Sequence, residues 1–143
     1  MADPHRIDSV ETLRAMYGQV SPIARVKVWS RIEPSARDFI ARAPFAVMAT
    51  ADADGNVDVS PKGDAAGFVV VEDERTLLIP DRRGNKLVFG LQNILANPHV
   101  GLIFMIPGTN ETLRVNGRAE LTRDPTCARD WRRADSRRCS SCA

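Results

Sequence analysis

Cysteine and histidine are almost absent from this chain of 143 residues, outside its C-terminal end. The two histidines are His5 and His99, and the three cysteines, Cys127, Cys139 and Cys142, all follow residue 122. This leaves little basis for nucleophilic catalysis. We expect no metal site, because the pair Cys139 and Cys142 would need two further ligands at a matching spacing. Motifs of the HExxH, P-loop and GxGxxG types are missing as well, so any redox chemistry would depend on a cofactor.

Long hydrophobic runs are also missing. The longest apolar stretch, residues 100–106, has the length of a strand and is far too short to cross a bilayer. The first nine residues are polar and do not resemble a signal peptide. The sequence therefore predicts a cytoplasmic protein with no membrane partner. Its 43% hydrophobic and 27% charged residues are ordinary for a globular domain of this length.

The net charge of +2 is unevenly distributed. Residues 123–143 contain six arginines and three aspartates, which leaves 14 basic and 15 acidic residues in the preceding 122. The body of the chain is therefore slightly acidic, which argues against nucleic acid as its partner. The alternative is a nucleic-acid-binding protein that uses the arginine-rich tail. Its binding would depend on salt and would be lost on removing the tail.

The composition changes abruptly after residue 122. Residues 123–143 contain no valine, isoleucine, leucine or phenylalanine, so this tail cannot contribute to a core and is expected to be disordered. We interpret the change as a C-terminal truncation or a loss of the natural reading frame. The alternative is a genuine arginine-rich extension. A defective product of a damaged gene would leave edge strands unpaired and would aggregate on expression.

Helix signals dominate residues 1–43, which we predict to form a helical leader. Ser9 is a suitable cap for a first helix that ends at Gly18. Pro22 suits the first turn of a second helix. A third helix is predicted over residues 33–42.

Strand signals dominate residues 44–122, which we predict to form the core domain. One amphipathic helix, with apolar residues at helical spacing from Leu87 to Leu95, interrupts the strands. Many short strands with tight turns predict a mainly β fold with helices, of the α+β class, closed as a barrel or stacked as a sandwich. The six predicted strands cover residues 45–51, 57–60, 68–71, 76–79, 100–106 and 112–121.

The loop before this helix concentrates groups that bind phosphate. Arg82, Arg83, Asn85 and Lys86 supply two guanidiniums, an amide and an ammonium beside a helix N-terminus, and Gly84 allows the backbone to approach closely. A phosphate monoester needs several such converging donors. Cations are unfavourable at a helix N-terminus unless an anion lies among them. The alternative reading is a solvated surface turn.

Two strand segments are weaker candidates. Ser60 and Lys62 share one face of a strand, and Pro61 between them indicates an edge or a bulge, where a flat ligand can lie against the backbone. The same pattern also fits an ordinary strand-to-turn transition. On the last strand, Thr112 and Arg114 lie on the polar face of the alternating pattern, and this face points either to a ligand or to solvent.

The order of these elements resembles the pyridoxamine 5'-phosphate oxidase-like proteins, and in particular a bacterial branch with an SPKGD or SPRGD strand end. The resemblance covers residues 20–122 and is carried by the segments VDVSPKGD, LLIPDRRGNKLVFGLQNILANPHVGLIF and ETLRVNGRAEL. It implies a six-stranded FMN-binding split β-barrel, preceded here by the helical leader. It also implies a homodimer with FMN in a cleft at the dimer interface.

The resemblance assigns FMN-binding residues by position. They are Val59, Ser60 and Lys62 for the isoalloxazine and ribityl chain, Ile79 and Pro80 beside the flavin, Arg82, Arg83, Asn85 and Lys86 for the phosphate, and Thr112 and Arg114 from the other subunit. Asn85 stands where the better-studied oxidases carry arginine, and Arg82 or Arg83 would substitute for it. The family's substrate-contacting arginine and histidine near the C-terminus have no counterpart here, which argues against oxidation of pyridoxamine phosphate itself.

We therefore expect an FMN-dependent oxidoreductase with a small-molecule substrate that the sequence does not identify. The flavin would exchange a hydride at N5, while Lys62 and backbone donors would stabilise negative charge near N1 and O2. No side chain is assigned as the catalytic acid or base. The alternative function is a flavin-binding module without turnover, such as a sensor or a carrier.

Overall fold

The computed structural model describes residues 5–25, 27–82 and 86–125. The chain forms two compact units, residues 1–30 and residues 31–143. The predicted boundary between leader and core lies after residue 43, so the observed division falls before the third helix instead of after it.

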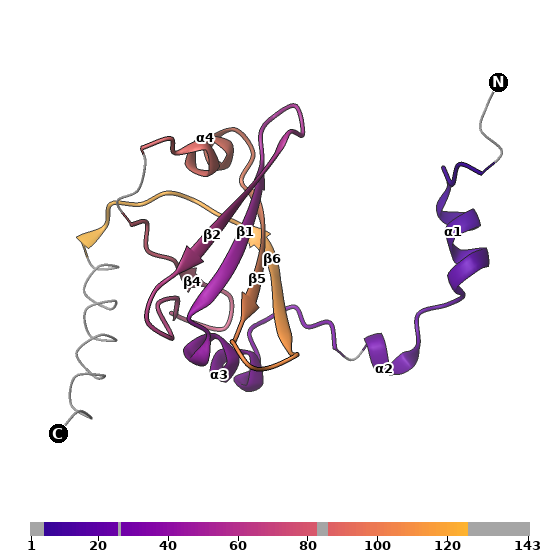
Figure 1. The fold of residues 1–143 in the computed structure, drawn as a ribbon, viewed down its shortest axis with the longest axis horizontal. Coiled ribbons are helices and arrows are strands. Elements are labelled where there is room, and N and C mark those ends of the chain that lie inside the picture. Colours follow the sequence, from indigo (N-terminus) through magenta and orange to yellow (C-terminus); the bar gives the residue numbers. More distant parts are fainter. Residues whose placement is uncertain (1–4, 26, 83–85, 126–143) are drawn as a thin grey trace. The chain divides into compact units, whose positions relative to one another are not determined.

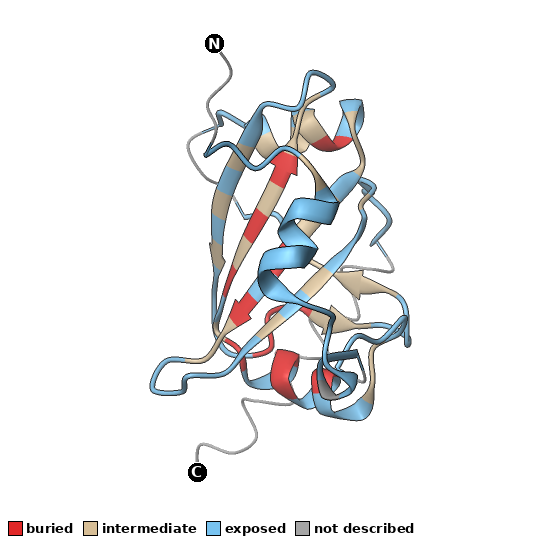
Figure 2. Cartoon of the chain, turned by 90° about the vertical axis from the view of Figure 1, so that its right-hand side faces the viewer, coloured by how far each residue is buried: buried red, intermediate tan, exposed pale blue. Residues whose placement is uncertain are grey.

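The first unit contains two short helices, α1 (Val10–Tyr17) and α2 (Pro22–Arg25). Ser9 caps α1 as the sequence predicts, because its Oγ accepts a hydrogen bond from the backbone N–H of Thr12 at 3.1 Å. Gly18, with φ of 72°, ends the helix and donates its N–H to the carbonyl of Arg14. Every residue of α1 is exposed (Figure 2).

The second unit is built on a four-stranded antiparallel sheet in the order β2-β1-β5-β6 (Figure 1). The four strands run over Phe45–Ala51 (β1), Val57–Gly63 (β2), His99–Met105 (β5) and Thr112–Arg118 (β6). Along β1, buried and half-buried residues alternate, as the banded strand in Figure 2 shows. This period of two places one face of the sheet on the core.

A second sheet holds the two remaining strands, β3 (Val70–Val71) and β4 (Leu77–Leu78). The predicted α+β class is thus confirmed, and six strands are present in the described part of the chain. They are divided four and two between separate sheets, and β3 and β4 are shorter than predicted. Phe68 and Val69 are buried, but they precede the ladder between β3 and β4.

Helix α3 (Pro34–Arg42) packs on the core of the second unit. Phe39 and Ile40 lie in one cluster with Met48 of β1 and with Leu102 and Phe104 of β5. Pro34 occupies the first turn, where a missing N–H costs no helical hydrogen bond. The helix belongs with the sheet because its apolar face is buried there.

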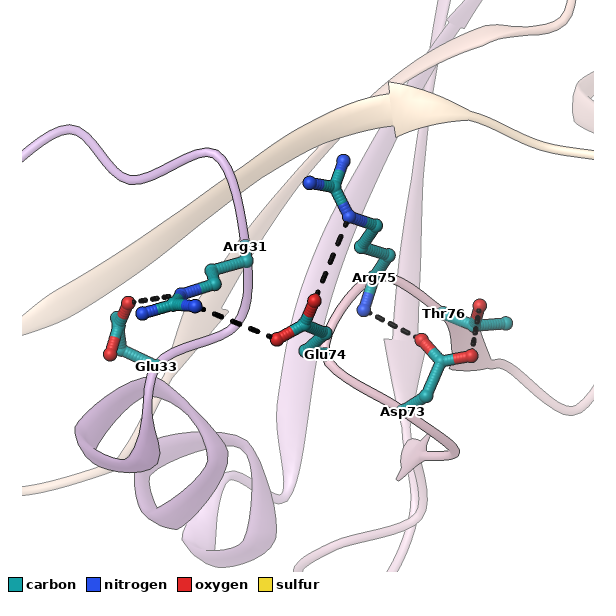
Figure 3. Close-up of polar contacts among 6 residues, drawn as sticks. All are labelled: Arg31, Glu33, Asp73, Glu74, Arg75 and Thr76. Atoms are coloured by element: carbon teal, nitrogen blue, oxygen red, sulfur yellow. Dashed lines mark hydrogen bonds and ion pairs between the residues drawn. The ribbon is translucent and has the colours of Figure 1, made fainter.

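Polar contacts join the start of α3 to the turn between β3 and β4 (Figure 3). Arg31 Nε donates to Glu33 Oε1 at 2.7 Å, and its Nη1 lies 3.8 Å from Glu74 Oε2. The backbone N–H of Ile32 also donates to the Glu74 carbonyl at 2.6 Å. The hydrogen bond with Glu33, followed by the charges of Glu33 and Glu74, raises the pKa of Arg31.

Helix α4 (Phe89–Ala96) begins later than the sequence predicts. Lys86 and Val88 have φ of 63° and 50°, which a right-handed helix does not allow. Leu87 and Val88 therefore precede the helix and are exposed, and Ile94 is its buried residue. The predicted apolar stripe is only partly directed at the core. Within the described ranges, no helix is both long and apolar enough to span a membrane.

Candidate functional site

Strand β2 is an edge of the four-stranded sheet and carries two of the predicted site side chains on one face. Asp58, Ser60 and Lys62 are half-buried, whereas the alternating residues of this strand are exposed. The register pairs these three with Thr50, Met48 and Ala46, which are all buried. We call this side of the sheet the inner face. The predicted common face of Ser60 and Lys62 is present.

The segment that follows β4 lies beside the end of β2. Lys62 Nζ is 3.8 Å from Asp81 Oδ1, and Arg82 Nε donates to Asp64 Oδ2 at 2.9 Å. Arg82 Nη2 contacts the same oxygen of Asp64. Two predicted site cations, 20 positions apart in the sequence, thus each contact a carboxylate of the opposite segment.

The other described members of this loop are less buried than the core. Ile79 and Pro80 are half-buried, whereas Arg82 and Lys86 are exposed. Arg83 and Asn85, which the sequence assigns to the phosphate, lie outside the described residues.

Helix α4 lies over the inner face at the Asp58 end. A Cβ at Gly90 would be 3.6 Å from Asp58 Oδ2 and 3.7 Å from Thr50 Oγ1. Asn93 Nδ2 donates to Thr50 Oγ1 at 3.1 Å, and Thr50 is only 3% exposed. Among the described residues, no side chain caps the N-terminus of α4, where the helix dipole and the first backbone N–H groups favour an anion.

Sequence reasoning missed three acidic residues at this place. Asp58, Asp64 and Asp81 all lie in segments that the sequence analysis considered, but none of them was predicted to be a site residue. The signal was the charge pattern of the two segments. Each contains one cation and one carboxylate: Lys62 and Asp64 at the strand end, and Arg82 and Asp81 in the loop. Opposite charges favour pairing, although the sequence does not show which segments meet.

Thr112 and Arg114 are not brought together with Ser60 and Lys62. Arg114 pairs with Ile103 in the register, Ile103 with Val47, and Val47 with Pro61. Both β6 residues are therefore on the face opposite Lys62. They also lie at the opposite edge of the sheet, three strand spacings or roughly 14 Å away.

The second side of the sheet, the outer face, carries partly exposed apolar side chains on β2, β1 and β5 and polar side chains on β6. Val57 and Val59 are 68% and 59% exposed, and Phe45 and Ile103 are 37% and 39% exposed. Val59, a predicted site residue, therefore shares this face with Arg114.

Solved structures with a similar fold include HupZ from Group A Streptococcus, in two crystal structures. Their TM-scores are 0.55 and 0.54, with 22% identity in each; the matches cover 71% of this chain and 82% and 78% of the HupZ chains. HutZ, the heme storage protein from Vibrio cholerae, has a TM-score of 0.48 and 18% identity, covering 74% of this chain and 80% of HutZ. At these identities the likeness to HupZ shows the fold alone.

Sequence comparisons add the family. A search of curated proteins found no match. A family model described as pyridoxamine 5'-phosphate oxidase matches residues 32–141. This match covers most of the chain, including β2, the loop after β4 and α4. The chain therefore belongs to the pyridoxamine 5'-phosphate oxidase family.

Proposed function

We propose that this chain binds FMN and serves as a flavin-dependent oxidoreductase for a small-molecule substrate. The observation that carries the proposal is the pairing of the β2 end with the loop after β4, in which Lys62 faces Asp81 and Arg82 contacts Asp64. The half-buried Ser60 lies on the same strand face as Lys62. The family to which the chain belongs supports a flavin as the ligand. The second candidate function is a flavin-binding module without turnover.

The donors present fit a phosphate monoester. Arg82 and Lys86 flank a short loop, and no side chain in the described part of the chain caps the N-terminus of α4 beyond it. Arg83 and Asn85 lie between them in the sequence and would add a guanidinium and an amide. Charge-assisted hydrogen bonds from such groups are the strongest that a protein offers to phosphate. We assign these four side chains to the FMN phosphate.

The half-buried residues around Lys62 suit the ring system. Ser60 and Lys62 would face the isoalloxazine and ribityl chain, with Ile79 and Pro80 along its edge and the β2 backbone at Val59 nearby. A bound flavin supplies hydride transfer at N5. The Lys62 side chain is only 21% exposed, and its ammonium would hold positive charge beside N1 and O2 and so favour the reduced, anionic flavin.

A homodimer reconciles the remaining site residues with one ligand. Thr112 and Arg114 are on the opposite face and edge of the sheet from Lys62, so one copy of the chain does not present both sets to the same ring. A second copy would supply them. The exposed valines of the outer face, Val57 and Val59, would be buried in such an interface.

The first test is a spectrum of the purified protein, followed by titration with FMN, riboflavin and hemin. We expect flavin absorbance and tighter binding of FMN than of riboflavin, with R82A and K86A each lowering FMN affinity roughly tenfold. A Soret band with no flavin affinity would overturn the proposal. Reduction of bound FMN by NAD(P)H would support the oxidoreductase, and its absence would favour the module without turnover.

The dimer has its own test. V59K would place a charge on the outer face, and we expect it to lower the solution mass from dimer to monomer and to weaken FMN binding with it. L95K is the matched control, because Leu95 is an exposed apolar residue of α4 outside that face. A wild-type monomer that binds FMN fully would refute the shared site.

A further inference from the structure

We infer that Asp64 is a positioning residue of the proposed phosphate site, where its carboxylate holds the Arg82 guanidinium beside the end of β2. The inference rests on the proposed function and deepens it. It adds a residue that contacts no ligand but sets the direction of one that does.

The Asp64 carboxylate is itself fixed by the backbone. Its Oδ1 accepts from the N–H of Ala65 at 2.8 Å, and its own N–H donates to the carbonyl of Pro44 at 3.1 Å. The other oxygen, Oδ2, accepts from Arg82. The carboxylate therefore has a set orientation before Arg82 reaches it.

The contact then fixes the plane of the guanidinium. Nε and Nη2 of Arg82 both reach Asp64 Oδ2. Because the donors of a guanidinium lie in one rigid plane, holding two of its nitrogens directs the whole group. Arg82 is on the protein surface, where a long side chain would otherwise sample many rotamers. Ordering it in advance reduces the entropy lost when phosphate binds.

The neighbouring ion pair provides a contrast. Asp81 lies 3.8 Å from Lys62, beyond hydrogen-bond distance, and is the more exposed carboxylate. Asp81 therefore attracts the Lys62 ammonium electrostatically but does not orient it through a hydrogen bond. Asp64 also has an opposing effect, since its negative charge repels phosphate. In this exposed setting solvent screens that repulsion, whereas the loss of a directed donor is not screened.

The experiment compares FMN with riboflavin in the wild-type protein, D64N, D64A and the matched control D81N. The quantity measured is the ratio of the riboflavin and FMN dissociation constants, which isolates the phosphate. We expect D64N and D64A to lower this ratio roughly tenfold with little change in riboflavin affinity, and D81N to lower it much less. Near-wild-type riboflavin binding also reports that the variants are folded.

A double-mutant cycle makes the test independent of folding losses. If Asp64 acts through Arg82, D64N has no further effect on the ratio in an R82A background. Additive effects, or a D64N ratio equal to or above the wild-type ratio, would overturn the inference while leaving FMN binding intact. A wild-type protein that binds no FMN, or binds FMN and riboflavin equally, would instead overturn the proposed phosphate site.

Discussion

Gly90 of α4 lies against Asp58 of β2, with 3.6 Å between the place of a Cβ at residue 90 and Asp58 Oδ2. Thr50 Oγ1 at 3.7 Å and Met48 Cε at 4.0 Å complete the surroundings of that position. All three are ordinary van der Waals distances. The space at residue 90 therefore accommodates a methyl group in ordinary contact, and these distances show how closely α4 covers the inner face.

The first prediction concerns this approach. G90A should raise the free energy of unfolding by about 0.5–1 kcal/mol, because alanine has the higher helix propensity and its methyl group fits. G90L should lower it by about 1–3 kcal/mol, since the added atoms collide with Met48 and Thr50. Urea denaturation of both variants provides the measurement. Equal effects of the two substitutions would contradict the close approach of α4.

The second prediction concerns the buried hydroxyl of Thr50. T50V keeps the shape but removes the acceptor of the Asn93 amide, so we expect a loss of about 1–3 kcal/mol in the free energy of unfolding. T50S is the control, because it retains the hydroxyl and loses only a methyl group. In T50V/N93L, where neither polar partner remains, part of the loss should be recovered. A T50V protein as stable as the wild type would show that the hydrogen bond contributes nothing.

The third prediction concerns acid stability. The backbone N–H of Arg75, together with the Thr76 hydroxyl, lowers the pKa of Asp73 below its ordinary 3.8 (Figure 3). Because its pKa is lowered in the folded state, the ionised Asp73 stabilises the folded protein, and this stabilisation is complete above the ordinary pKa. It is then lost as pH falls through the lower, folded-state pKa.

D73N tests this sign. The substitution should destabilise the protein at neutral pH, and the difference from the wild type should shrink as pH falls below 3.8. Asparagine resembles the protonated aspartic acid, so the two unfolding free energies should converge at the acid end. Unfolding in urea at a series of pH values measures the difference. A difference in unfolding free energy that is constant over the whole pH range would contradict a stabilising role for the ionised Asp73 carboxylate.

Local signals in the sequence predicted the elements that depend on near neighbours. The Ser9 cap and the stop at Gly18 follow from the chemistry of single residues, and β1 was predicted with its observed bounds because an apolar run is unambiguous there. The shared face of Ser60 and Lys62 follows from the period of a strand alone. These features need no knowledge of the rest of the fold.

The features that sequence reasoning missed depend on distant segments or on unusual local backbone. The contact of Asp64 with Arg82 joins residues 18 apart, and no local pattern states that these two turns meet. The late start of α4 depends on left-handed backbone at Lys86 and Val88, which Val88, a β-branched residue, does not suggest. Thr112 and Arg114 were assigned to the ligand of the other subunit, and that assignment stays a prediction. Within one chain, the register places them on the face opposite Lys62, which is a property of the assembled sheet.

The last prediction concerns the boundary between the two compact units. A variant that lacks residues 1–30 should keep a cooperative unfolding transition, because the compact unit begins at residue 31. Removing residues 1–43 instead should abolish it, since α3 would be lost with Phe39 and Ile40, the latter only 1% exposed. Circular dichroism during heating distinguishes the two outcomes.

A point substitution in α3 measures how much this helix contributes to the stability of the second unit. I40A should cost about 2–5 kcal/mol of unfolding free energy, as expected when a fully buried isoleucine leaves a cavity. L95A, at a position 76% exposed, should change it by less than about 0.5 kcal/mol. If I40A were as mild as L95A, α3 would contribute nothing to the core. The helical leader would then extend to residue 43, as the sequence alone suggests.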